Sequence, residues 1–276
     1  MIEKKEQFIM ILSKIQAHRG ASAYRPENTL EAFSLALEQG ADGIELDVHL
    51  SKDGCVVVAH DARLERVSNG VGLINDYTLA ELKKLNFNKL FPGQPACVIP
   101  TLDEVYDLLK NTAVSVNVEL KTAELLYPEL PEKLAGIERR HSFMNGRVIY
   151  SSFNHYSLAA LKKINPEAKI GLLYQMGLID PWVYANYVSA DAIHPHYAVI
   201  AALPETVARC HENGVMVNVW TADDPETLAY MFKCGVDAVI TNKPDVAAVC
   251  RERENARKIK NEPNKNETGD DKNDGG

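Results

Sequence analysis

The chain has 276 residues, of which 46% are hydrophobic and 25% charged, a balance typical of a globular protein long enough to bury a full core. Its formal net charge of -8 gives no general basic field, which argues against nucleic acid as a partner. Five scattered cysteines without CxxC spacing predict free thiols, and the start of the chain offers neither a cleavage site nor an apolar run for a membrane anchor, so we expect a cytoplasmic protein.

Apolar, β-branched runs alternate with helical patterns along the chain. The runs predicted to form strands are 14–18, 42–48, 113–120, 147–151, 169–174, 191–194, 215–220 and 237–241. Helical patterns separate them, including 128–141, 155–163, 181–188, 204–213 and 243–257. Eight strands in such alternation predict an α/β fold, a (β/α)8 barrel of the TIM type. The alternative is an open doubly wound sheet, but no GxGxxG fingerprint follows a strand.

Capping signals mark where two of the helices begin. Asn28 followed by Glu31 resembles a capping box, and it predicts that the first helix starts at Asn28. Thr101 and Glu104 form a second capping box ahead of an apolar face.

A β-hairpin interrupts the alternation after the second strand. The strand-like runs 44–50 and 55–60 are separated only by Ser-Lys-Asp-Gly, which is too short for a helical crossover and contains a hairpin signal. An antiparallel return would bring His60 back opposite Glu45 and Asp47.

Residues 62–100 are predicted to form a small inserted subdomain, because they lack a strand–helix alternation of their own. The segment contains one short capped helix, starting at Thr78, and it could cover the mouth of the barrel. Residues 258–276 have almost no apolar side chains and are predicted to be a disordered polar tail. The remaining chain, 1–257, is expected to be a single catalytic barrel domain.

Polar side chains gather at the ends of the first three barrel strands, where (β/α)8 enzymes carry their chemistry. These residues are His18, Arg19, Glu45, Asp47, Glu119 and Lys121. Because side chains alternate along a strand, Glu45 and Asp47 share one face. Charges on the helix-packed outer face would be buried unpaired, so we expect both carboxylates to point into the barrel mouth.

Three converging carboxylates repel one another and stay ionised only around a cation. Glu45, Asp47 and Glu119 are hard oxygen donors, which suit one divalent cation, Mg²⁺ or Ca²⁺. His18 and His60 are candidate acid–base groups, and Arg19 and Lys121 add positive charge matched to phosphate. One strand-end histidine is more often structural; the convergence of all these residues is what indicates phosphoester cleavage.

The chain resembles the glycerophosphodiester phosphodiesterase family. The shared motifs are His18-Arg19-Gly20 with Pro26–Thr29, then Glu45–Val48 with Ser51–Gly54 and Val57–Asp61, then Val118–Lys121, and more weakly Asn218–Thr221 and Gly235–Thr241. The resemblance extends over roughly residues 14–250, and Ser51 replaces the commoner threonine of the hairpin.

The resemblance implies a distorted barrel with a small insertion, a divalent cation, and hydrolysis of glycerophosphodiesters to glycerol 3-phosphate and an alcohol. Its residue roles follow the chemistry above: His18 and His60 would be the acid–base pair, Glu45, Asp47 and Glu119 the metal ligands, and Arg19 and Lys121 the phosphate-binding groups.

Several points stay open at this level. Glu27 is a candidate for binding glycerol hydroxyls, but it fits helix entry equally well. Trp220 is a candidate for an apolar wall beside the substrate, although aromatic residues are more often part of a core. A related phosphodiesterase of the lysophospholipase D type and a catalytically inactive phosphodiester-binding barrel are the alternative functions. The leaving alcohol, the native metal, the attacking group, the assignment of acid and base, and the oligomeric state are not determined by the sequence.

Overall fold

The computed structural model describes residues 13–260, and within them eight parallel strands close into a barrel, which confirms the predicted fold. The barrel strands are β1 (Lys14–His18), β2 (Gly43–Leu50), β4 (Ser115–Leu120), β5 (Val148–Ser152), β6 (Lys169–Tyr174), β7 (Ala192–Pro195), β8 (Met216–Val219) and β9 (Ala238–Thr241). Each strand pairs with the next in this order, and β9 and β2 both pair with β1, which closes the ring.

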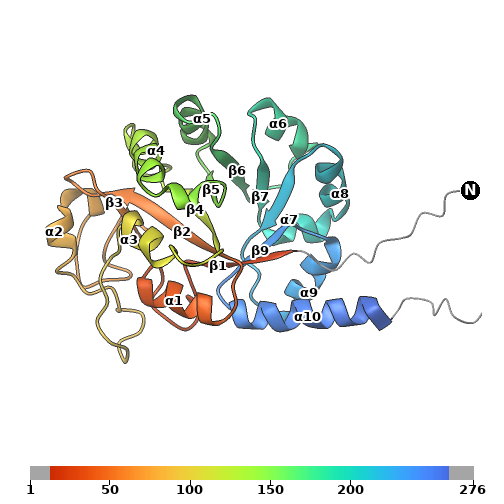
Figure 1. Cartoon of the computed structure of the whole chain (residues 1–276), viewed down its shortest axis with the longest axis horizontal. Helices are drawn as coiled ribbons and strands as arrows, with labels where there is room; N and C mark the ends of the chain where they lie inside the picture. Colours follow the sequence, from red (N-terminus) through yellow and green to blue (C-terminus); the bar gives the residue numbers. More distant parts are fainter. Residues whose placement is uncertain (1–12, 261–276) are drawn as a thin grey trace, which may run out of the picture.

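Helices surround the barrel on its outside (Figure 1). They are α1 (Leu30–Glu38), α3 (Leu102–Leu108), α4 (Leu130–Arg140), α5 (His155–Ile164), α6 (Pro181–Tyr187), α7 (Tyr197–Ala202), α8 (Glu205–Glu212), α9 (Pro225–Cys234) and α10 (Pro244–Lys260). The short helix α7 was not predicted from the sequence. The predicted tail lies outside the described residues from 261 on, and α10 runs through Lys260.

The start of α1 differs from the prediction. Thr29 is the N-cap, and its hydroxyl accepts a hydrogen bond from the main-chain N–H of Ala32. Asn28 cannot be the cap because its φ of 58° places it in the left-handed region and its amide turns toward the barrel. The capping box at Thr101 is present as predicted.

The barrel strands separate an apolar outer layer from a polar interior. Outward residues such as Leu46, Val118 and Ile170 belong to the main hydrophobic cluster between strands and helices. The residues that alternate with them along the strands, among them Glu45 and Asn117, are buried polar groups. The hydrophobic layer therefore stabilises the fold, and the interior of the barrel is left for polar chemistry.

The predicted hairpin follows β2. Strand β3 (Val56–Val58) pairs antiparallel with β2, with Val48 opposite Val58. The main-chain N–H of Ala59 donates to the carbonyl oxygen of Asp47 at 3.0 Å. The pairing therefore returns the chain beside the carboxylates of β2, immediately before His60.

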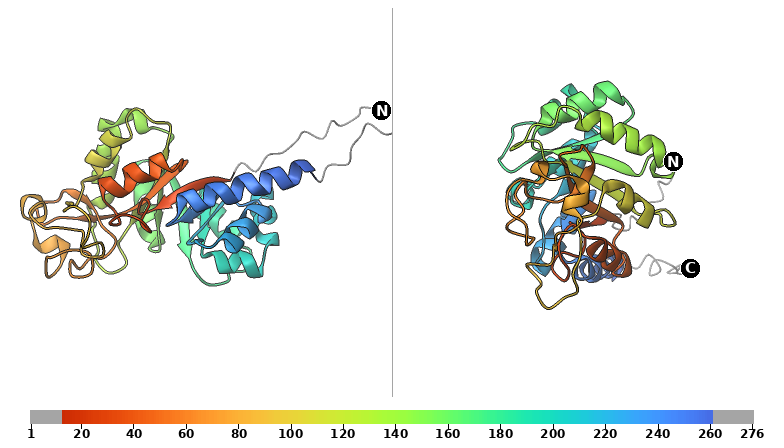
Figure 2. Two further views of the ribbon diagram at one scale, coloured as in Figure 1. Left: turned by 90° about the horizontal axis from the view of Figure 1, so that it is seen from below. Right: turned by 90° about the vertical axis from the view of Figure 1, so that its left-hand side faces the viewer.

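The insertion after β3 has a hydrophobic cluster of its own. Its members include Leu64, Ile74, Leu82 and Phe87, and the segment contains a 3-10 turn, η1 (Ile74–Asp76), and the short helix α2 (Leu79–Leu82). Figures 1 and 2 show it projecting from one end of the molecule. Contacts such as the hydrogen bond from the amide of Gln94 to the carbonyl of Tyr24 join it to the loop after β1.

Among residues 13–260, no helix has the length and the apolar character that crossing a bilayer requires.

Candidate active site

A tight turn after β1 places the first two site residues. Arg19 has φ 57° and Gly20 has φ 82°, so the chain reverses directly after His18. A Cβ on Gly20 would lie 2.6 Å from the carbonyl carbon of Ala32, so only glycine allows this close approach to α1. The N–H of Arg19 donates to Glu45 through both its carbonyl oxygen and Oε2, each at 2.9 Å, which fixes the turn to β2.

One pocket of about 100 Å³ opens at the carboxyl ends of the strands. Its lining includes these predicted residues: His18, Arg19, Glu45, His60, Glu119, Lys121 and Trp220. They come from β1, β2, the hairpin, β4 and the loop after β8, so the barrel ring brings together residues that are far apart in sequence.

Three carboxylates cluster at this pocket: Glu45 and Glu119 line it, and Asp47 is buried beside them. Glu45, Asp47 and Glu119 each offer one oxygen, and these oxygens lie within 4.8 Å of one another. Burial and the charge of Asp47 raise the pKa of Glu119 to about 7, and burial with the charges of Asp47 and Glu119 raises the pKa of Glu45 well above its usual range. The three groups therefore do not all ionise unless positive charge is placed among them.

Two cationic side chains meet Asp47 from opposite sides. Arg19 Nε lies 3.5 Å from Oδ2, and Lys121 Nζ lies 3.7 Å from Oδ1 and 2.9 Å from Glu119 Oε1. Burial opposes the charge on Asp47, but the positive charges of Arg19 and Lys121 outweigh it and lower its pKa. Asp47 is therefore the ionised centre of the cluster.

The two carboxylate oxygens of Asp47 differ in their hydrogen bonding. Asn28 donates its amide N–H to Oδ2 at 2.9 Å, whereas the buried Oδ1 has no hydrogen-bond partner among the described residues. A buried carboxylate oxygen without a donor is costly unless a cation is in direct contact with it, and Lys121 Nζ is 3.7 Å away, beyond hydrogen-bond distance. Together with the oxygen-only donor set of Glu45 and Glu119, this fits a hard divalent cation.

His18 is held by an amide. Its Nδ1 lies 2.7 Å from Asn242 Oδ1, and its Nε2 lies 3.9 Å from Glu45 Oε2. The amide nitrogen of Asn242 donates to Asp223 Oδ2 at 2.5 Å, so the amide oxygen must face the ring. His18 therefore carries its proton on Nδ1 and presents an unprotonated Nε2.

Burial and the neighbouring charge of Arg19 lower the pKa of His18 to about 4. An amide partner adds no negative charge that would favour the imidazolium form. At neutral pH His18 is therefore uncharged.

His60 has a charged partner instead. Its Nδ1 lies 2.5 Å from Asp61 Oδ1, and Arg66 Nε donates to the other oxygen of Asp61. Burial lowers the pKa of His60, and the negative charge of Asp47 opposes that shift. The carboxylate of Asp61 is suited to stabilise the imidazolium, which a proton donor requires.

Glu27 does not line the pocket. Its carboxylate accepts hydrogen bonds from Arg19 at 2.9 Å and from both terminal nitrogens of Arg66 at 2.7 and 2.8 Å. It therefore joins the insertion to Arg19, and its role toward glycerol stays a prediction.

The far side of the pocket is apolar. Trp220 and Phe153 meet edge to face with ring centroids 5.5 Å apart, and Leu173 lies beside them in the lining. The indole N–H of Trp220 donates to the carbonyl of His194 at 2.8 Å, which holds the ring in place. The strand ends β1, β2 and β4 thus form a polar half of the mouth, and β5, β6 and the loop after β8 form an apolar half.

Sequence reasoning missed the residues that orient the reactive groups: Asn28, Asp61, Arg66, Asp223 and Asn242. Asp61 stood next to a candidate histidine, which was a usable signal. Asn242 lies 224 residues from His18 and directly follows a predicted strand end, which was the only hint to it.

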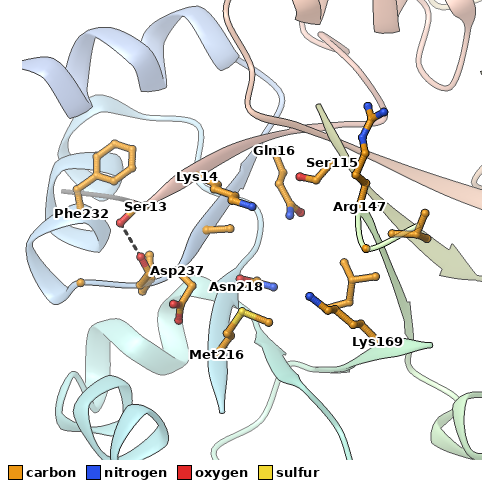
Figure 3. Close-up of a pocket in the computed structure, with 16 residues that line it drawn as sticks. Ser13, Lys14, Gln16, Ser115, Arg147, Lys169, Met216, Asn218, Phe232 and Asp237 are labelled. Carbon is orange, nitrogen blue, oxygen red and sulfur yellow. Dashed lines mark hydrogen bonds between the residues drawn. The ribbon is translucent and has the colours of Figure 1, made fainter. Parts of the chain in front are cut away.

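A second cavity of about 350 Å³ opens at the opposite end of the barrel (Figure 3). Lys14, Gln16, Lys169 and Asn218 are among its lining residues. Its lining contains none of the residues predicted for the site.

Comparison with known proteins identifies a family. The model of the glycerophosphoryl diester phosphodiesterase family matches residues 18–246. A glycerophosphodiester phosphodiesterase of Caldanaerobacter subterraneus is 48% identical in sequence, and the match covers 83% of this chain and 93% of that protein. A glycerophosphodiester phosphodiesterase of Bacillus altitudinis is 37% identical, and the match covers 87% of this chain and 99% of that protein. The structure of an Oleispira antarctica phosphodiesterase in complex with sn-glycerol-3-phosphate is 29% identical, with a TM-score of 0.79 over 87% of this chain and 96% of that one.

Proposed function

The chain belongs to the glycerophosphoryl diester phosphodiesterase family, and we propose that it hydrolyses glycerophosphodiesters to glycerol 3-phosphate and an alcohol, using one divalent cation and a pair of histidines. The observation that carries this proposal is the pocket in which three clustered carboxylates, two cationic side chains and two histidines meet. Each of these groups has a function that phosphoester cleavage requires.

The phosphate group needs positive charge on its non-bridging oxygens. Arg19 and Lys121 line the pocket, and the adjacent carboxylates raise the pKa of both, so they stay cationic although burial opposes it. Mg²⁺ or Ca²⁺ held by Glu45, Asp47 and Glu119 would add a Lewis acid that polarises a phosphoryl oxygen.

Phosphoester hydrolysis requires two proton transfers, and each histidine is assigned to one of them. His18 presents an unprotonated Nε2, since Asn242 fixes its tautomer, and we assign it as the base that accepts the proton of the attacking hydroxyl. His60, backed by Asp61, is assigned as the acid that protonates the leaving alkoxide. Each transfer is typically worth about 10²–10⁴-fold in rate.

The test compares leaving groups in two variants. His18→Ala and His60→Ala should each lose most activity on a methyl ester of glycerophosphate, in assays with metal-stripped protein restored by Mg²⁺ or Ca²⁺ in turn. A nitrophenol leaves without protonation, so a nitrophenyl diester should largely rescue His60→Ala and should leave His18→Ala impaired.

Rescue of His18→Ala instead of His60→Ala would reverse the assignment. Near-normal activity of either variant on the methyl ester would remove that histidine from the mechanism. Full activity of the wild-type chain without any added metal would reject the cation.

A further inference from the structure

An apolar groove of about 370 Å³ runs outward between the loops that follow β5 and β6. Its lining includes Met176, Leu178, Ile179 and Tyr184, and none of the residues that line it is Asp, Glu, Lys or Arg. Ile179 is 96% exposed and Met176 is 64% exposed. Large apolar side chains that are exposed together in one groove indicate a binding surface rather than a core.

The groove is continuous with the catalytic pocket. Phe153 and Leu173 line both, so the apolar half of the mouth leads directly into it. The one histidine in the lining is not free to bind a polar ligand, because His155 has one ring nitrogen 3.1 Å from Tyr184 Oη and the other 3.1 Å from the carbonyl oxygen of Leu173. Gln175 is the one amide in the lining and the other residues are apolar or aromatic, so the groove favours an apolar occupant that is joined to the phosphate.

The two halves of the mouth orient a diester. Polar groups on β1, β2 and β4 suit the hydroxyls of glycerol, and among the described residues the apolar lining of the pocket continues over Phe153 and Leu173 into the groove. A diester placed this way directs its second alcohol into the groove.

We propose that this groove binds the hydrocarbon chain of the second alcohol, so that the preferred substrates are glycerophosphodiesters whose leaving alcohol carries an alkyl or acyl chain. The inference rests on the proposed function and names its substrate class. The reaction is unchanged: water adds to phosphorus, the bond from phosphorus to the chain-bearing oxygen breaks, and that oxygen receives a proton.

The expected effect grows with chain length. Complete burial of one methylene is worth roughly a fourfold gain in kcat/KM, and a groove that is open to solvent on one side should give about twofold. A hexyl ester of glycerophosphate, with five methylenes more than the methyl ester, should then be favoured by roughly 30-fold. Both esters are assayed as monomers, below any micelle-forming concentration.

Two exposed positions of the groove test the assignment. The double variant Met176→Asn/Ile179→Asn should reduce the hexyl-to-methyl ratio of kcat/KM to below about threefold. The matched control is Val183→Asn, because Val183 is 60% exposed on α6 but does not line the groove. The control should keep the wild-type ratio.

The results separate the two proposals. A wild-type chain that hydrolyses the methyl ester without any preference for hexyl rejects the groove alone, and a chain that hydrolyses neither ester rejects the proposed function with it. If Ile179→Asn converts a dimer into a monomer in sedimentation while the ratio stays at its wild-type value, the groove is a subunit interface and the inference is wrong.

Discussion

Replacing Asn242 by leucine should impair catalysis through His18 while leaving the fold in place. Leucine has the branched shape of asparagine, although it is larger, and it offers no acceptor to Nδ1 of the histidine. The surrounding loop keeps its support, since Asp223 Oδ1 still accepts hydrogen bonds from the main-chain N–H of residue 242, at 2.8 Å, and from Thr241 Oγ1, at 3.1 Å.

The size of the loss follows from what Asn242 contributes. A net hydrogen bond is worth about 1 kcal/mol, so the tautomer preference alone accounts for roughly fivefold. Removal of a general base costs about 10²–10⁴-fold, which sets the upper limit. Because the ring also loses its orientation, we expect Asn242→Leu to reduce kcat by roughly 10–50-fold, between these bounds.

The assay measures kcat on the methyl ester in two backgrounds. In wild-type protein Asn242→Leu should give the full loss, and in His18→Ala protein it should cost less than about twofold, because two residues that act as a unit are not additive. Ser22→Ala is the matched control: it removes a hydroxyl that lies 2.7 Å from both Asn242 Oδ1 and the carbonyl oxygen of His18 but leaves the contact between Asn242 and the His18 ring, and it should stay within about threefold of wild type.

An equal loss in both backgrounds would mean that Asn242 acts on the structure and not on the histidine. Thermal unfolding of each variant shows which explanation holds, since a structural role lowers the melting temperature together with kcat.

Three further predictions concern the cation and the barrel interior. Glu119→Gln should weaken metal affinity by at least about tenfold and reduce activity with the fold intact; unaltered metal dependence in that variant would contradict the ligand assignment. Burial and the charge of Asp47 raise the pKa of Glu119 to about 7, so a proton must leave Glu119 before the cation binds. Calorimetry should therefore find that metal affinity falls by up to about tenfold from pH 7 to pH 6. A metal affinity independent of pH would argue against Glu119 as a ligand. Gly171→Ala would place a Cβ 2.3 Å from His194 Nε2 and should lower the free energy of unfolding by about 1–3 kcal/mol in denaturant titrations. The control is Gly93→Ala: nothing lies within 4 Å of a Cβ there, and the free energy of unfolding should change by less than about 0.5 kcal/mol.

The ring of strands and the carboxylate cluster could be predicted because they follow from local patterns. Period-two alternation places Glu45 and Asp47 on one face, and the Asp-Gly signal returns the chain to His60. These features depend on residues within a few positions of one another, and the closed barrel then supplies the long-range proximity of Glu119.

The orienting contacts could not be predicted because they depend on tertiary structure. Asparagine serves equally well as a helix cap and as an amide donor, and only the left-handed turn at Arg19 decides that Asn28 binds Asp47. Arg66 is an ordinary surface residue by sequence, but the insertion carries it back to Asp61 and Glu27.

The insertion leaves and re-enters the barrel at adjacent points. Val57 bridges Thr101, and the main-chain N–H of Val58 donates to the carbonyl of Pro100 at 2.9 Å, so both ends of the segment are anchored on β3. The cost of closing a loop grows only by about 0.6 kcal/mol for each doubling of its length. Evolution, or an engineer, can therefore exchange the part of the segment beyond Arg66 for a longer or shorter one while β3 and the Asp61–Arg66 pair keep His60 at its position, so barrel and insertion can diverge at different rates.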